Sequence, residues 1–198
     1  MLCLYLKEKK MITLKGKLIT LEPLDVKKHA RGYFEVSQDE NIHKYTGNSV
    51  PKDIHEIEAL LKKYEEYFIN WMIISNDSQN VIGILRLGKP ELENGMLIAG
   101  ESQFLSSPYW RKGHMKEAKS LFYQYVFDEL SVEMLFADVW AGNTNSMKSL
   151  ESYGYKLIET RYEVFSKTGE RTEKYIYALS KDDYLLNLKK KNVVYDVK

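Results

Sequence analysis

The sequence contains very little cysteine and carries almost no net charge. Cys3 is its single cysteine, which excludes an internal disulfide framework. The four histidines, His29, His43, His55 and His114, are scattered without the spacing of metal ligands. A formal net charge of +1 gives no argument for nucleic acid or an acidic membrane surface as the main partner. We therefore expect a cytoplasmic protein that holds no metal.

The chain also lacks long apolar runs, internal repeats and the common nucleotide-binding patterns. Its start, MLCLYLKEKK, has few apolar residues and carries its positive charges after them, so it predicts neither a signal peptide nor a membrane span. Neither G-x-x-x-x-G-K-S/T nor G-x-G-x-x-G occurs. With 198 residues, 44% of them hydrophobic, the chain can fill one core. We expect one domain over residues 11–186, an extension over 1–10 and a tail over 187–198.

A basic turn around Gly113 is the most informative stretch, because it leads directly into an amphipathic helix. The helix shows the spacing of one buried face at Ala118, Leu121, Phe122, Tyr125, Val126 and Leu130, so it begins between residues 111 and 116. A helix N-terminus favours an anion through its unpaired N–H groups and its dipole. Gly113 permits a close approach. Further positive charge comes from Arg111, Lys112, Lys116 and His114. The alternative is a solvated basic loop.

A second motif covers residues 132–155. Residues 132–140 are almost entirely apolar and predict a strand covered on both faces. Asn143, Asn145 and Ser146 are typical N-cap residues, and Gly154 stands where a helix would end in a left-handed residue. Helix capping alone is the alternative explanation for these four residues.

Periodicity and turn residues predict a mixed α+β domain built on one sheet, in the order βααβββαβαββ. The expected strands cover residues 18–22, 71–75, 81–87, 97–105, 132–140, 160–166 and 174–179, and the expected helices cover 26–36 and 54–68, with one helix after each of the two motifs.

Together, the turn WRKGHM, its helix, the following strand, N-T-N-S and a closing G-Y resemble the GNAT superfamily of acyl-CoA-dependent N-acetyltransferases. The likeness is greatest to the RimJ/RimL-type group, which acetylates protein N-termini, and it extends over roughly residues 14–185. Trp110, Gly113 and Met115 take the three places of the group's pattern Q/R-x-x-G-x-G/A, and Asn143 with Ser146 matches its N-x-x-S. Met115 and Arg111 depart from the usual small residues there.

The resemblance implies a single domain whose mixed central sheet, flanked by helices, contains two parallel strands that splay apart. One of these ends near Leu105 and the other contains Asp138. It further implies that acetyl-CoA is the cofactor. Enzymes of this type often pair as homodimers, and the sequence leaves the oligomeric state open. The implied cofactor-binding residues are Leu105, Arg111, Lys112, Gly113, His114, Met115, Lys116, Asn143 and Ser146. The acceptor would be a primary amine, on a protein N-terminus or a small molecule. A non-catalytic acyl-CoA-binding module with the same fold is the alternative.

The implied reaction is attack of a neutral amine on the thioester, which requires a base, N–H donors and a proton for sulfur. Asp138 is the first candidate base, because an acid on a buried strand is costly unless it is paired or functional. Pairing with a buried cation is equally consistent with the sequence. Glu163 and Glu101 are the other candidates. Leu150 occupies the place where many GNAT enzymes carry a proton-donating tyrosine, so Ser146 is the remaining donor.

The sequence also has fifteen tyrosines, most of which we expect in the core or at its rim. Tyr33, Tyr45 and Tyr109 are candidates to line an acceptor cleft.

Overall fold

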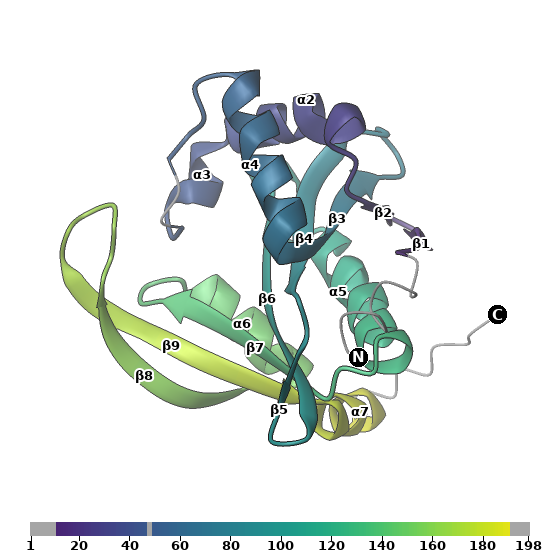
Figure 1. The fold of residues 1–198 in the computed structure, drawn as a ribbon, viewed down its shortest axis with the longest axis vertical. Helices are drawn as coiled ribbons and strands as arrows, with labels where there is room; N and C mark the ends of the chain where they lie inside the picture. The colour runs from purple at the N-terminus through teal and green to yellow at the C-terminus, as the bar shows by residue number, and fades with distance from the viewer. Residues whose placement is uncertain (1–10, 47–48, 191–198) are drawn as a thin grey trace.

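The computed structural model describes residues 11–46 and 49–190 (Figure 1). These residues form one sheet in the strand order β1-β2-β3-β4-β6-β7-β9-β8, with β5 paired to β6. The strands are β1 (Leu14–Lys15), β2 (Ile19–Pro23), β3 (Phe68–Ser75), β4 (Val81–Gly88), β5 (Glu91–Glu93), β6 (Met96–Leu105), β7 (Met134–Trp140), β8 (Lys156–Val164) and β9 (Arg171–Ser180). The expected extension over 1–10 lies outside the described residues.

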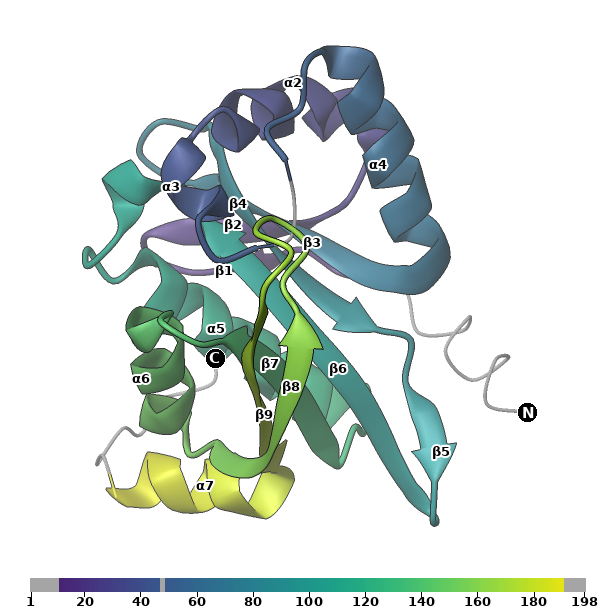
Figure 2. The same cartoon turned by 90° about the vertical axis from the view of Figure 1, so that its left-hand side faces the viewer.

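Helices cover both faces of the sheet. They are α2 (Val26–Ser37), α3 (Glu40–His43), α4 (Ile54–Tyr67), the 3-10 turn η1 (Ser107–Tyr109), α5 (His114–Gln124), the π-helical turn η2 (Tyr125–Glu129), α6 (Thr144–Tyr153) and α7 (Lys181–Lys190). α2 and α4 cover one face of β3 and β4, whereas α5 and α7 lie on the opposite face (Figure 2). The mixed single-domain fold expected from the sequence is confirmed.

The central strands β6 and β7 separate part of the way along their length. They are parallel neighbours only from the pair Ile98 and Met134 to the pair Gly100 and Phe136. Beyond this point β6 continues to Leu105 with β4 as its neighbour, while β7 continues beside β9. The splayed pair that the family resemblance implied is therefore present, and the two strands are apart along the last residues of β6, from Glu101 to Leu105.

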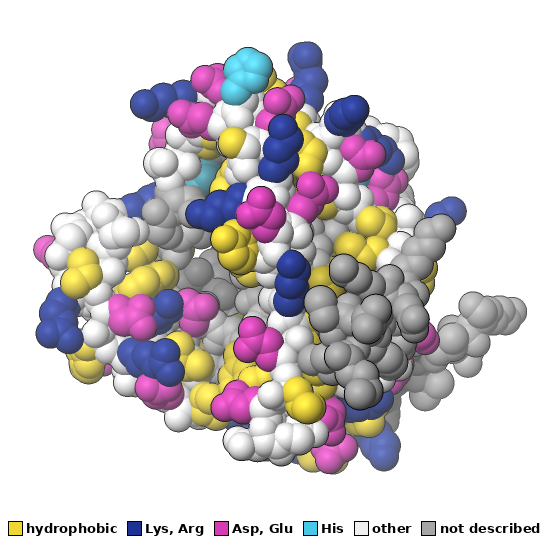
Figure 3. Space-filling model, viewed as in Figure 1, with side chains coloured by type: hydrophobic (Ala, Val, Ile, Leu, Met, Phe, Trp, Pro, Cys, Tyr) yellow, Lys and Arg dark blue, Asp and Glu magenta, His cyan; other side chains and the backbone are white. Residues whose placement is uncertain are grey.

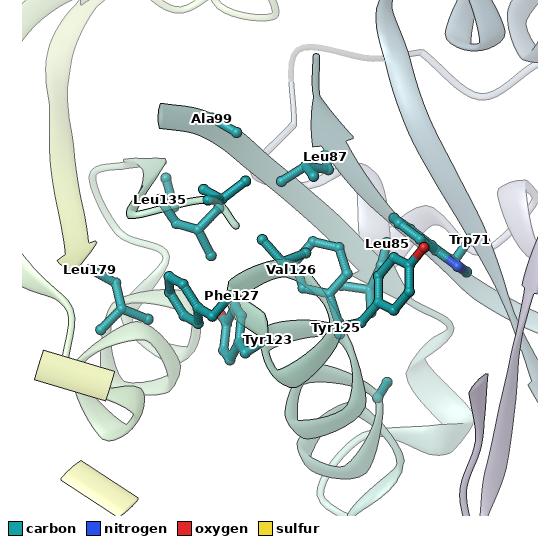
Figure 4. Packing of buried hydrophobic residues seen from close by; sticks show 14 of the residues in the cluster. Trp71, Leu85, Leu87, Ala99, Tyr123, Tyr125, Val126, Phe127, Leu135 and Leu179 are labelled. Atoms are coloured by element: carbon teal, nitrogen blue, oxygen red, sulfur yellow. The ribbon is translucent and has the colours of Figure 1, made fainter. Parts of the chain in front are cut away.

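The main core lies between the sheet and the α5–η2 helix. Ala118, Phe122 and Val126 are fully buried, as the helical periodicity predicted. Trp71 of β3 makes edge-to-face contacts with the rings of Phe122 and Tyr125, with centroids 5.6 Å apart in both pairs. Figure 4 shows how this helix turns its aromatic side chains toward the strands. The packing holds the N-terminus of α5 at the open edge of β6.

Three features differ from the sequence-based expectation or add to it. The strand over 132–140 begins at Met134 and is not covered on both faces, because buried and exposed side chains alternate along it and the Asp138 side chain is 50% exposed. β1, β5 and α3 are additional short elements. α7 extends to Lys190, through the first four residues of the expected tail, whose remainder lies outside the described residues.

Candidate active site

The basic turn has the local geometry that its sequence predicted. Gly113 is the N-cap of α5 and adopts a left-handed conformation with φ of 88°, while Arg111 before it has φ of 58°. No side chain caps this helix end. The Glu117 N–H bonds to the Gly113 carbonyl at 3.0 Å, so the preceding N–H groups of the first turn have no partner within the helix. These N–H groups make the turn suitable for an anion.

Glu117, the acid in this first turn, has a structural role that the sequence did not reveal. Its carboxylate accepts hydrogen bonds from the backbone N–H groups of Lys17, Leu18 and Ile19, at 2.8, 2.7 and 3.0 Å. A negative group at this helix end is consistent with the helix dipole. The three bonds fasten the loop between β1 and β2 to α5.

A cavity of about 610 Å³ extends from the basic turn to the start of α6. Three cations line it, Lys44, Arg111 and Lys116, and no acid does so among the residues that the structure describes. The predicted cofactor-binding residues Leu105, Arg111, Gly113, Met115, Lys116, Asn143 and Ser146 all line this cavity. Lys112 and His114 do not. Both sequence motifs therefore contribute to one cavity whose lining charge is positive.

The α6 side of the cavity is formed by the N-x-x-S motif. Asn143 is the N-cap of α6, and its side-chain oxygen accepts the Ser146 N–H at 3.2 Å. Asn143 thus caps the helix, which was the alternative to a role in cofactor binding. The Ser146 hydroxyl makes no hydrogen bond to another described residue and lines the cavity. Gly154 ends α6 with φ of 99°, as predicted.

Asp39 positions α3 beside this cavity, another role that the sequence did not reveal. Its side chain caps α3 and also accepts the Ser107 N–H at 2.6 Å. Burial acts to raise the pKa of Asp39, but the hydrogen bonds from Ser107 and Asn41 outweigh it, so the pKa is lowered. The short helix is therefore held against the loop that leads to the basic turn.

The candidate bases lie apart from the cavity lining. Asp138 and Glu163 both contact the Lys174 ammonium, at 2.9 and 3.4 Å. Burial acts to lower the pKa of Lys174, but the two carboxylates outweigh it and raise the pKa. Asp138 is therefore paired with a cation, as the alternative to a catalytic role required, although the pair is partly exposed. Figure 3 shows acidic and basic side chains interspersed over β8 and β9.

Glu101 belongs to a different, fully buried cluster. Its Oε1 atom lies 3.3 Å from the Lys119 ammonium and 2.9 Å from the Tyr123 hydroxyl. The Lys119 side chain is 0% exposed and the Glu101 side chain 2%. Burial lowers the pKa of Lys119, and the Glu101 carboxylate partly offsets this by raising it. Neither residue lines the cavity.

The tyrosine candidates are divided between two cavities. Tyr45 and Tyr109 line the cavity described above, whereas Tyr33 lines a second one beneath α2, α3 and α4. Leu150, at the place of the usual proton-donating tyrosine, is buried in the core.

No helix within residues 11–46 and 49–190 is long and apolar enough to cross a membrane. Nowhere in these segments do three or more His, Cys, Asp or Glu side chains gather as possible metal ligands.

Comparison with known proteins gives one consistent family. The model of the acetyltransferase (GNAT) domain matches residues 19–156. The probable N-acetyltransferase YjcK of Bacillus subtilis is 32% identical over 152 residues, which cover 72% of this chain and 82% of that protein. Among solved structures, a GCN5-related N-acetyltransferase from Brucella melitensis superposes with a TM-score of 0.79 at 22% identity, covering 92% of this chain and 84% of that one. RimJ of Mycobacterium smegmatis, in complex with CoA-disulfide, gives 0.73 at 14% identity, with 88% and 89% covered.

The two structural likenesses concern the fold, which is the one described above. The domain match extends over both motifs that form the cavity, the basic turn and the N-x-x-S helix. The chain is an acetyltransferase and belongs to the GNAT family.

Proposed function

We propose that the protein binds acetyl-CoA in the cavity of about 610 Å³ and transfers its acetyl group to a primary amine by direct attack in a ternary complex. The observation that carries the proposal is the charge of this cavity, with Lys44, Arg111 and Lys116 in its lining and no acid among the described lining residues. Coenzyme A is a polyanion, and acetyltransferases of this family use it. Positive side chains beside unpaired helix N–H groups suit its pyrophosphate.

The cavity also fits the remainder of the cofactor. Gln103 lines the cavity, and its Oε1 atom is buried without a hydrogen-bond partner in the described part of the chain. A buried acceptor without a partner is costly, and an amide N–H of the pantetheine arm would supply one. Past Gly100 no strand within residues 11–46 and 49–190 pairs with the edge of β6 that faces β7, which leaves backbone groups for the same arm. Met115 lines the cavity with its side chain, while its backbone N–H belongs to the first helical turn.

The proposed chemistry requires only modest proton transfer. An α-amine with a pKa of about 8 loses roughly 1 kcal/mol to protonation at neutral pH, whereas a lysine near 10.4 loses about 4 to 5 kcal/mol. Asp138 or Glu163, which lie apart from the cavity lining, would accept the amine proton through water. The Ser146 hydroxyl would donate a proton to the departing thiolate. We propose a protein N-terminus or a small-molecule amine as the acceptor.

The test is the midpoint of thermal unfolding with and without acetyl-CoA, with acetate and ADP as controls. A ligand at a hundred times its dissociation constant adds about 2.7 kcal/mol to the free energy of unfolding. We expect acetyl-CoA to raise the midpoint clearly, and acetate to leave it unchanged. An unchanged midpoint at saturating acetyl-CoA would refute the assignment of the cavity.

Ser146→Ala separates catalysis from capping. If the hydroxyl protonates the leaving thiolate, kcat should fall by about 100-fold, the lower end of the range for a general acid, with little change in the KM for acetyl-CoA. Ser149→Ala is the matched control, because Ser149 lines the same cavity one turn further along α6. Steady-state kinetics of both variants decide the point. Equal kcat values in wild type and Ser146→Ala would show that the hydroxyl has no catalytic role and that Ser146 contributes only to the start of α6.

Three finer assignments stay predictions: membership of the RimJ/RimL-type group, a homodimeric state and a cytoplasmic location. The solved RimJ structure supports the first only through its fold, because its identity to this chain is 14%.

A further inference from the structure

A second cavity of about 320 Å³ adjoins the first, beneath α2, α3 and α4. Ile42, Thr46 and Phe104 line both cavities, so the two meet near the end of β6. Most of the second lining is aromatic or aliphatic and includes Tyr33, Ile57, Leu60 and Tyr64. Its volume lies at the lower end of the range of about 300–1,000 Å³ that small-molecule sites occupy.

The two cavities differ in charge. Among the described residues, the first is lined by three cations and no acid, whereas the second is lined by one acid, Glu56, and by no lysine or arginine. A polyphosphate is therefore favoured in the first cavity, and a basic group is tolerated in the second. This separation suits a reaction between a polyanionic donor and an amine.

His43 of α3 lines the second cavity, and its ring has a buried nitrogen. Its Nε2 atom lies 2.8 Å from the carbonyl oxygen of Ser37. A carbonyl oxygen can only accept, so Nε2 carries the hydrogen and Nδ1 of the neutral ring has a lone pair. Nδ1 is buried and has no hydrogen-bond partner among the described residues, and the residue is 7% exposed.

The backbone of His43 is also held in place. Its carbonyl oxygen accepts hydrogen bonds from the Lys167 ammonium, in the turn between β8 and β9, and from the Thr46 hydroxyl. The ring is thus fixed at Nε2 and the backbone at the carbonyl, which leaves Nδ1 as a preorganised acceptor.

We propose that the second cavity binds the acceptor, a primary amine that carries an aromatic or aliphatic group, and that His43 Nδ1 accepts a hydrogen bond from its nitrogen. The proposal rests on the proposed acetyl transfer, since it assigns the substrate class of the same site. The apolar group lies among the aromatic and aliphatic side chains, and the amine meets the thioester where the cavities join. An arylalkylamine and a peptide that begins with a large apolar residue share this chemistry.

Two variants of His43 separate binding from structure. In His43→Gln the side-chain amide N–H can still bond to the Ser37 carbonyl, but the acceptor at Nδ1 is lost. In His43→Asn the amide oxygen can take the place of Nδ1, but the bond to Ser37 is lost. With 2-phenylethylamine as acceptor, we expect His43→Gln to raise KM by about 10- to 100-fold at an unchanged unfolding midpoint. His43→Asn should lower the midpoint and keep KM closer to that of the wild type.

A KM for His43→Gln equal to that of the wild type would overturn the role of His43. Leu60→Trp provides a second test that leaves His43 intact, because a larger side chain reduces the cavity. It should raise KM for 2-phenylethylamine and leave KM for 2-aminoethanol unchanged. Equal effects on both amines would overturn the assignment of the apolar cavity.

The acceptor panel compares 2-phenylethylamine, 2-aminoethanol, and two tetrapeptides that differ only in a first residue of Phe or Ser. We expect the wild type to prefer the phenyl-bearing member of each pair by at least about tenfold in kcat/KM, since an apolar contact group contributes that much. Turnover of only 2-phenylethylamine would identify the acceptor as a small amine, and turnover of only the Phe peptide would identify it as a peptide N-terminus. A preference for 2-aminoethanol and the Ser peptide would overturn the proposal while acetyl transfer itself stands.

Calorimetry of 2-phenylethylamine binding, without acetyl-CoA, separates this proposal from the proposed function. If acetyl-CoA does not bind but 2-phenylethylamine binds to the wild type and not to His43→Gln, the cavity assignment holds and the acetyl-transfer assignment fails. If acetyl-CoA binds and 2-phenylethylamine neither binds nor is acetylated, the cavity assignment fails alone.

Discussion

Replacing Gly113 by aspartate should abolish the binding of acetyl-CoA. Gly113 has φ of 88°, and a Cβ there would meet only Leu18 Cδ1 within 4 Å, at 3.4 Å. Any side chain at this φ strains the backbone, and Asp is among the residues that tolerate left-handed conformations best. Its carboxylate would then stand among the groups proposed to hold the pyrophosphate. Two like charges about 4 Å apart repel by roughly 4 kcal/mol at an effective dielectric constant of about 20, which corresponds to about a thousandfold in affinity.

Gly113→Asn is the matched control, because asparagine has nearly the same shape, tolerates the same conformation and carries no charge. Titration calorimetry with acetyl-CoA should show strong loss in Gly113→Asp and a much smaller one in Gly113→Asn. Equal losses would assign the effect to side-chain volume. Unchanged affinity in Gly113→Asp would contradict the placement of the pyrophosphate at this turn.

The sequence predicted the elements with strong periodicity and missed the short or polar ones. The helix over 54–68 and the strand over 81–87 are found as α4 and β4, because their apolar residues follow one clear period. β5 has three residues, all exposed, and α3 has four, so neither offers a pattern long enough to detect. α7 is mostly polar, and of its described side chains only Tyr184 is buried.

The site was predictable where its chemistry is local. The turn around Gly113 and the capped start of α6 are each encoded within a few residues, so helix-terminus signals found them. The prediction that Asp138 is buried was wrong. A run of apolar residues does not reveal that one face of β7 lacks a covering layer. The bonds of Glu117 to the β1–β2 loop join residues 98 to 100 positions apart, a separation over which the sequence gives no pairing signal.

The contact between Glu101 and Lys119 joins two elements across 18 positions, and the sequence gives no signal for it either. Lys119 is on the buried face of α5 next to Ala118, in a helix whose apolar residues gave no sign of an internal cation. Glu101→Gln keeps the shape of the side chain and leaves the Lys119 charge without its carboxylate. Removing one partner of a buried ion pair costs about 3–5 kcal/mol, a large part of the roughly 5–15 kcal/mol that stabilises a typical domain. Urea unfolding of Glu101→Gln should show a correspondingly lower midpoint.

The double variant Glu101→Gln with Lys119→Met provides the control, since it removes both charges and keeps the length of the Lys119 chain. It should recover most of the lost stability, because replacing a whole buried pair is often close to neutral. A single variant as stable as the wild type would contradict the pairing. A double variant as unstable as Glu101→Gln would show that side-chain packing, rather than charge, causes the loss.

The pH dependence of Glu101→Gln gives an independent check of the same pair. Burial lowers the pKa of Lys119 from its ordinary value of 10.5, and the Glu101 carboxylate counteracts this. Without that carboxylate the folded-state pKa falls further, so between it and 10.5 the unfolded chain holds more protons than the folded one. The free energy of unfolding must then rise with pH across this window. We expect a steeper rise in Glu101→Gln than in the wild type, and none of this extra slope in the double variant, which has no lysine to titrate.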